Sequence, residues 1–219
     1  MTHRWSPRIV IARLPRLITG LALAGIGVAL MAHSGLGLGP WEVFHQGISR
    51  QTGIPLGTVS IILGAPILLA WWPLGQRPGP GTVLNICLVG LTTNIVLGLL
   101  PPVTPPLSRV ALLSAGVLSM GIGSGLYLAA GLGAGPRDGL MTGLHHRFGW
   151  SIARARTLLE LTVLVVGFIL GGTVGLGTLL FAGSIGLMVQ LSLRLFDREG
   201  RVTRHRPVEL DAGPLTAVP

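Results

Sequence analysis

Three carboxylates and two amides are the side chains of this chain whose positions could support chemistry. Glu42 and Asp138 each stand three residues after a glycine that is followed by proline, and Glu160 lies inside an apolar run. The amides Asn94 and Gln190 lie inside two other apolar runs. A polar or charged group in such a run faces protein or water rather than lipid, and often marks a path for ions or solutes. These five residues are therefore candidates for substrate binding or coupling.

The composition predicts a multi-pass membrane protein. Of the 219 residues 49% are hydrophobic and only 11% are charged, whereas a soluble domain has roughly a quarter of its residues charged. Several apolar runs reach the length of about 20 residues that crosses a bilayer as a helix. The net charge of +9 comes from arginines between and beyond these runs. This placement is typical of a lipid-embedded protein and argues against a nucleic-acid partner.

The apolar runs predict an all-α fold with six transmembrane helices. They cover residues 17–32, 56–72, 81–100, 110–130, 152–170 and 177–196. Short amphipathic helices are expected after the first and fourth spans, because apolar residues recur there on one helical face. The first covers residues 41–51, and the second has Leu140, Met141, Leu144 and Phe148 on its apolar side. The remaining segments are a basic N-terminus at 1–16, a proline-rich linker at 101–107 and a tail at 197–219. The tail is polar without apolar periodicity, so we expect it to be disordered.

The chain repeats itself at an offset of 96 positions. Residues 13–99 align with 109–195 without a gap and with 26 identities in 87 positions. This composition would give about a tenth by chance, so the repeat is genuine. It divides the chain into three-span units at 17–100 and 108–196. An odd number of spans makes the second unit enter from the opposite side, which predicts a three-plus-three inverted repeat.

The arginines predict the orientation. With both termini cytoplasmic, fourteen arginines lie on the inner side, and only Arg50 and Arg109 lie on the outer side. Cytoplasmic loops carry the excess of basic residues in membrane proteins. We therefore expect both the N- and C-termini to be cytoplasmic.

Two glycine loops occupy matching places in the halves and lead into the short helices. The residues expected to shape them are Gly35, Gly37, Gly39 and Pro40 in the first, and Gly131, Gly133, Gly135, Pro136 and Arg137 in the second. Glycine- or proline-interrupted segments at matching places of an inverted repeat point to a transport site. The helix N-termini that they create attract anions.

A structural interpretation remains open for each candidate. Glu42 and Asp138 stand where a carboxylate caps a helix start. Amides such as Asn94 and Gln190 often hold membrane helices together by hydrogen bonds. Glu160 follows Arg156 by four residues, the spacing of an ion pair on one helix face.

The sequence predicts no enzyme, metal or cofactor site. His, Cys, Asp and Glu show no metal-ligand spacing. There is no phosphate-binding loop, nucleophile elbow or zinc-protease motif.

The glycine loops resemble those of the YczE-like branch of the YitT/YczE bacterial membrane proteins. The resemblance rests on Gly35-Leu-Gly-Leu-Gly-Pro-Trp-Glu-Val43, Gly131-Leu-Gly-Ala-Gly-Pro-Arg-Asp-Gly-Leu-Met141, Gly171-Gly-Thr-Val-Gly-Leu-Gly-Thr178 and the Arg156 and Glu160 pair. It covers about residues 13–196. Glu42 stands where the family pattern has aspartate. The resemblance implies a multi-pass protein of the bacterial cytoplasmic membrane and supplies no substrate.

These patterns favour a small secondary transporter or exporter with its site between the two Gly-Pro loops. The alternative is a membrane accessory protein that does not transport and docks on a partner through its arginine-bearing cytoplasmic segments. The sequence names neither the solute nor the partner, and association of identical copies is open.

Overall fold

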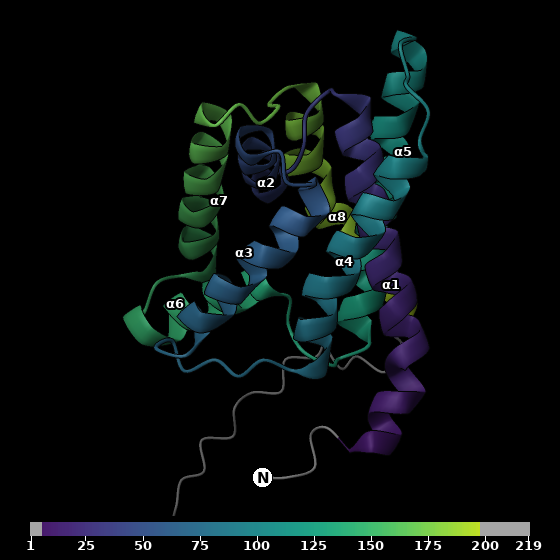
Figure 1. Ribbon diagram of the computed structural model, residues 1–219. Helices are drawn as coiled ribbons and strands as arrows, with labels where there is room; N and C mark the ends of the chain where they lie inside the picture. Colours follow the sequence, from purple (N-terminus) through teal and green to yellow (C-terminus); the bar gives the residue numbers. More distant parts are fainter. Residues whose placement is uncertain (1–5, 198–219) are drawn as a thin grey trace, which may run out of the picture.

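Eight α-helices make up the part of the chain that the computed structural model describes, residues 6–197 (Figure 1). They are α1 (Pro7–Ser34), α2 (Pro40–Thr52), α3 (Leu56–Trp71), α4 (Pro80–Leu99), α5 (Pro106–Ala129), α6 (Pro136–Phe148), α7 (Ile152–Ile169) and α8 (Leu176–Phe196). These residues include no strand, which confirms the all-α class. Helix α1 takes in most of the basic segment that was predicted to precede the first span. The predicted disordered tail, from residue 198 on, lies outside the described residues.

Prolines and glycines mark the helix ends. Helices α2 and α6 begin at Pro40 and Pro136, at a position where the N–H that proline lacks would have no intrahelical partner. They end at Gly53 and Gly149, whose φ angles of 73° and 68° lie in the left-handed region that glycine adopts without strain. Local backbone preferences in the sequence therefore mark where both short helices begin and end.

Several helices meet the requirements for crossing a membrane. Helices α1, α4, α5 and α8 are each long and apolar enough, and α2 with α3 meet the same test together, as a pair bent by 112°. Helix α7 has 18 residues and includes Arg154, Arg156 and Glu160. Six complete spans in a three-plus-three inverted repeat stay a prediction.

The helices form two groups whose contacts match between the halves. Helix α1 packs on α4 and α5, and α5 packs on α8; separately, α2 packs on α3 and α7, and α6 packs on the same two helices. The first group includes the long helices on the right of Figure 1, and α2, α3, α6 and α7 lie on its left. We call these the long-helix group and the short-helix group. Helix α3 joins them by packing along α4.

Helices α1 and α5 cross closely because glycines face each other. A Cβ on Gly27 would lie 2.7 Å from the carbonyl oxygen of Gly116, and a Cβ on Gly123 would lie 2.5 Å from that of Gly20. The offset of 96 relates Gly20 to Gly116 and Gly27 to Gly123, so the two contacts are equivalent. Small residues give membrane helices this close approach and the dispersion energy that comes with it.

Each glycine loop rests on the opposite half of the chain. Gly81 N–H donates to Leu132 O at 2.9 Å, and Gly177 N–H donates to Leu36 O at 2.8 Å. The loops at 131–135 and 35–39 thus lie against the starts of α4 and α8. Irregular backbone at membrane depth is tolerated where protein buries it and satisfies its polar groups. The two halves do this for each other.

Helix α2 is buried on its polar side as well as on its apolar side. Its polar residues Glu42 and His45 are buried along with Trp41 and Val43. The physical reason is that α3 and α7 both pack on α2. A helix covered on more than one side can bury polar residues wherever a partner faces them.

The equivalent contacts of the short helices exchange large and small residues. On α7, Gly167 packs against the backbone of Val43 and Phe44 in α2. In the equivalent pair, the large residue belongs to the other helix, because Trp71 of α3 packs against Gly139 of α6. Both contacts depend on a glycine: Gly167 lets the α2 backbone approach α7, and Gly139 accommodates the Trp71 ring.

Replacing Gly37 by alanine should destabilise the fold. Gly37 has φ 121°, and a Cβ there would lie 2.8 Å from Thr178 Oγ1 and 2.9 Å from the backbone nitrogen of Gly175. Backbone strain and overpacking each cost on the order of 1–3 kcal/mol. Unfolding in mixed micelles should show the loss. Gly98→Ala in α4, where a Cβ would have no neighbour within 4 Å, should change stability by no more than about 1 kcal/mol. Equal behaviour of the two variants would contradict the role of the loop contact.

Candidate functional site

A cavity of about 360 Å³ lies between the two helix groups, and both Gly-Pro helix starts face it. Pro40 and Trp41 come from the start of α2, and Pro136, Arg137 and Asp138 from the start of α6. Helices α1, α4, α5, α7 and α8 supply the rest of the wall, and α3 supplies none. Residues far apart in the sequence thus converge on one site, within the usual volume range of small-molecule pockets.

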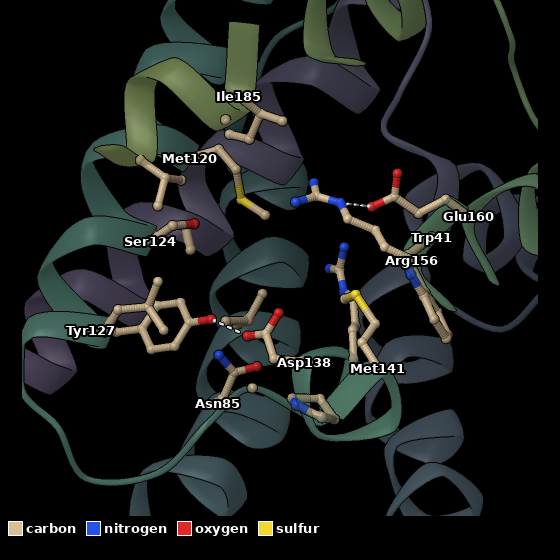
Figure 2. Close-up of a pocket in the computed structure, with 18 of the residues that line it drawn as sticks. Trp41, Asn85, Met120, Ser124, Tyr127, Asp138, Met141, Arg156, Glu160 and Ile185 are labelled. Carbon is tan, nitrogen blue, oxygen red and sulfur yellow. Dashed lines mark hydrogen bonds and ion pairs between the residues drawn. The ribbon is translucent and has the colours of Figure 1, made fainter. Parts of the chain in front are cut away.

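Polar and apolar side chains share the wall (Figure 2). The polar ones are Asn85, Ser124, Tyr127, Arg137, Asp138, Arg156, Glu160 and Gln190. The large apolar ones include Trp41, Met120, Met141, Phe181 and Ile185. Charged groups beside apolar surface can bind a ligand that is both charged and apolar.

The start of α6 pairs with the start of α2. Arg137 Nη2 donates to Glu42 Oε1 in a short ion pair, and the guanidinium carbon lies 5.8 Å from the centre of the Trp41 ring. The Glu42 side chain is 4% exposed and that of Arg137 is 27% exposed. Arg137 lines the cavity, whereas Glu42 does not. Glu42 therefore acts on the cavity through the charge and position of Arg137.

Two buried polar atoms beside this pair lack hydrogen bonds. Glu42 Oε2 and His45 Nε2, one helical turn apart on α2, have no partner among the described residues. Each such atom costs about 1–3 kcal/mol. Helix stability alone does not account for two polar side chains kept at this cost.

Asp138 points into the cavity from the first turn of α6. Its Oδ2 accepts a hydrogen bond from the Tyr127 hydroxyl of α5 at 3.1 Å (Figure 2). No ion pair involves it within residues 6–197. Asp138 is thus the carboxylate of the cavity wall that forms no ion pair with an arginine of the described residues.

Arg156 and Glu160 form a second ion pair on α7. Arg156 Nε lies 2.9 Å from Glu160 Oε1, and the side chains are 49% and 32% exposed. Both line the cavity, so this pair reaches the site as well as stabilising the helix. An exposed pair at this spacing contributes at most about 1 kcal/mol.

The two equivalent amides have different surroundings. Asn94 lies outside the cavity wall: its Oδ1 accepts from Gly57 N–H and its Nδ2 donates to Thr58 Oγ1, both at 2.8 Å. Gln190 is exposed and lines the cavity. Asn94 therefore holds α4 to α3, and only Gln190 remains a candidate for substrate contact.

Side-chain capping in this structure uses hydroxyl groups rather than the two carboxylates, as at Ser151 of α7 and at two threonines. Thr82 and Thr178 Oγ1 accept hydrogen bonds from Gly79 and Gly175 N–H at 3.2 and 3.3 Å, at the starts of α4 and α8. Helices α2 and α6 have no side-chain cap bond. Glu42 and Asp138 instead bond to Arg137 and Tyr127. Among the described residues, no three His, Cys, Asp or Glu side chains could hold a metal ion together.

Sequence reasoning missed two members of the site. Tyr127 lies in an apolar span with no local pattern to single it out. Arg137 was assigned only to loop shape, although the repeat holds the relevant signal: Trp41-Glu42 and Arg137-Asp138 occupy equivalent positions. A two-fold axis that brings equivalent helix starts together can place the acid of one beside the arginine of the other.

A largely apolar chain, all-helical over the described residues, whose long apolar helices are able to cross a bilayer, defines an integral membrane protein. The chain belongs to a family of unknown function (DUF6198), whose model matches residues 11–194. It is 36% identical to the uncharacterized membrane protein YczE of Bacillus subtilis over 177 residues, which cover 80% of this chain and 82% of that protein. The resemblance to YczE-like proteins is confirmed.

Two further relatives match most of the chain. An uncharacterized protein of Haemophilus influenzae is 46% identical over 182 residues, covering 83% of this chain and 84% of the relative. The uncharacterized protein YyaS of Bacillus subtilis is 25% identical over 190 residues, with shares of 82% and 91%. No solved structure matches the chain.

Neutralising Glu42 should destabilise the protein more than neutralising Glu160. Glu42→Gln leaves the Arg137 charge without its buried partner, a change that costs about 3–5 kcal/mol in buried pairs. Glu160→Gln breaks an exposed pair and should cost at most about 1 kcal/mol. Unfolding in mixed micelles measures both. Glu42→Leu with Arg137→Met removes both charges and should recover most of the loss; a double variant as unstable as Glu42→Gln would show that the pair itself is not responsible.

Proposed function

We propose that this protein is a small secondary transporter whose solute binds in the cavity between the starts of α2 and α6. The supporting observation is the convergence of both Gly-Pro helix starts, one from each half, on a cavity with four charged side chains. Secondary transporters with inverted repeats bind substrate at the repeat interface, beside interrupted helices. A protein that only stabilised a partner would gain nothing from an interior cavity of this kind.

The proposed topology is six spans as a three-plus-three inverted repeat with both termini cytoplasmic. Matching hydrogen bonds support the repeat: Arg13 Nη1 donates to Ala130 O at 3.3 Å, and Arg109 Nε donates to Ser34 O at 2.6 Å. The offset of 96 relates both the two arginines and the two acceptors. Each bond holds the start of one long helix to the end of the other, so α1 and α5 run in opposite directions. In the bacterial inner membrane, the positive-inside rule sets this orientation.

The charges favour a cationic solute. Arg137 pairs with Glu42 and Arg156 pairs with Glu160, which leaves the Asp138 charge in excess when His45 is uncharged. An excess charge in a site of low dielectric constant is costly unless a counter-ion or a proton offsets it. We infer that an organic cation binds beside Asp138 and supplies the compensating charge. The cation's apolar part would contact Met120, Met141 and Trp41.

Flux measurements in proteoliposomes test this function. Protein-dependent flux of ammonium ions such as phenethylammonium is expected, driven by an opposite proton gradient, with less flux of carboxylates of similar size such as hydrocinnamate. Asp138→Asn should lower cation flux at least about tenfold, because the compensating charge is lost. Asp138→Glu keeps the charge and should retain part of the flux.

The outcomes separate the two functions that the sequence left open. Flux that is unchanged in Asp138→Asn would overturn the cation site. No flux of ammonium ions, carboxylates or neutral solutes by folded protein, together with a stoichiometric protein partner in purified samples, would favour the accessory function instead.

A further inference from the structure

The two helix groups meet closely on one side of the molecule and stand apart on the other. Helix α3 packs along α4, whereas the equivalent helices α7 and α8 have almost no contact among the described residues. Correspondingly, α7 and α8 both line the cavity and α3 does not. The two halves of the chain are therefore in different states, although their sequences share a pattern.

The closed contact depends on two glycines and one amide. A Cβ on Gly57 of α3 would lie 1.9 Å from the carbonyl oxygen of Gly90 in α4, and a Cβ on Gly90 would lie 2.4 Å from that of Gly57. Asn94, one turn after Gly90, accepts from Gly57 N–H and donates to Thr58 Oγ1. Backbones pack directly here, and the amide bonds them across the contact.

The equivalent residues of the other half keep the pattern without the contact. They are Ala153 for Gly57, Gly186 for Gly90 and Gln190 for Asn94. A Cβ on Gly186 would have no neighbour within 4 Å, and both Ala153 and Gln190 are exposed. The Gln190 side chain has no hydrogen bond among the described residues. This half thus has the small residues and the amide one turn later, but they form no contact between α7 and α8.

We propose that α7 closes on α8 in a second conformation through Ala153, Gly186 and Gln190, while α3 separates from α4. The residue sizes fit this closure. Alanine in place of glycine adds one methyl group and holds the helices further apart, and glutamine is one methylene longer than asparagine. Gln190 can therefore cross the wider contact and accept from Ala153 N–H, as Asn94 accepts from Gly57 N–H.

This movement would expose the cavity to the two membrane faces in turn. The present state is closed near the start of α3 and open near the start of α7, and an inverted topology puts those ends on opposite faces. Rocking of one group against the other is a recognised route to alternating access. The purpose of the movement rests on the proposed transport function, while the movement itself can be tested without transport.

Cysteine cross-linking tests the closure in membranes. In a Cys87→Ala background, Ala153→Cys with Gly186→Cys should form a disulfide on oxidation, because closure brings the two Cα atoms within about 7 Å. The matched control is Ala153→Cys with Gly183→Cys. Gly183 is also unobstructed, but it is equivalent to Cys87, which stays exposed beside the closed α3–α4 contact. The test pair should cross-link at least about tenfold faster than the control.

A second pair reports on the present state. Gly64→Cys with Ile86→Cys joins α3 to α4 where a Cβ on Gly64 would lie 2.4 Å from the Ile86 side chain. This pair should cross-link as well, in separate samples. A disulfide between positions 64 and 86, with none between 153 and 186, would overturn the second conformation.

Gly186→Leu should block closure, because its side chain fills the space that α7 must enter. It should lower flux at least about tenfold, and Gly183→Leu should not. Filling the cavity could also lower flux, so a further readout is needed: Gly186→Leu should increase the yield of the disulfide between positions 64 and 86, which cavity filling alone would not change.

The two proposals fail in different ways. Cross-linking between 153 and 186 in a protein that moves no solute leaves the closure standing and removes the transport function. Flux that survives Gly186→Leu, in a protein without that cross-link, leaves transport standing and removes this closure.

Discussion

The satisfaction of irregular backbone inside a membrane protein is the constraint on which this structure depends. Two glycine loops interrupt the helices, and their carbonyls need donors wherever protein covers them. The donors come from the opposite half, because Gly81 bonds to Leu132 and Gly177 bonds to Leu36. Neither half could keep its loop alone. This mutual dependence also brings the starts of α2 and α6 to a common cavity, so the backbone constraint and the site have one origin.

The site combines a rigid part with an accessible part. Glu42 lies behind the wall, almost fully buried, and its ion pair with Arg137 joins the two short helices. Arg137, Asp138 and the Arg156–Glu160 pair line the cavity itself. The five charged side chains thus differ in burial. The Glu42–Arg137 pair fixes where α2 and α6 meet, and the other groups of the wall are left to contact a ligand.

Local signals in the sequence predicted the helices well, and distant pairings poorly. Pro40, Pro136, Gly53 and Gly149 act through their own backbone preferences, so the ends of α2 and α6 could be read directly. The Arg156–Glu160 contact follows from spacing on one helix. The Glu42–Arg137 pair joins residues 95 positions apart, and no helical periodicity encodes it. The sequence also could not predict that Asn94 bonds α4 to α3 while Gln190 lines the cavity. Both residues are amides at equivalent positions, and they differ because α3 packs on α4 whereas α7 has almost no contact with α8 among the described residues.

The exchange of large and small residues between equivalent contacts has a consequence for how such a chain could be divided. Two copies of the first half, arranged as the two halves are, would set the Trp71 ring against the backbone of Val43 and Phe44, where the present contact has Gly167. Two copies of the second half would set Gly139 against Gly167 and leave a void. Neither half is therefore complementary to itself. An assembly of two identical halves with this arrangement would therefore need other residues at these positions.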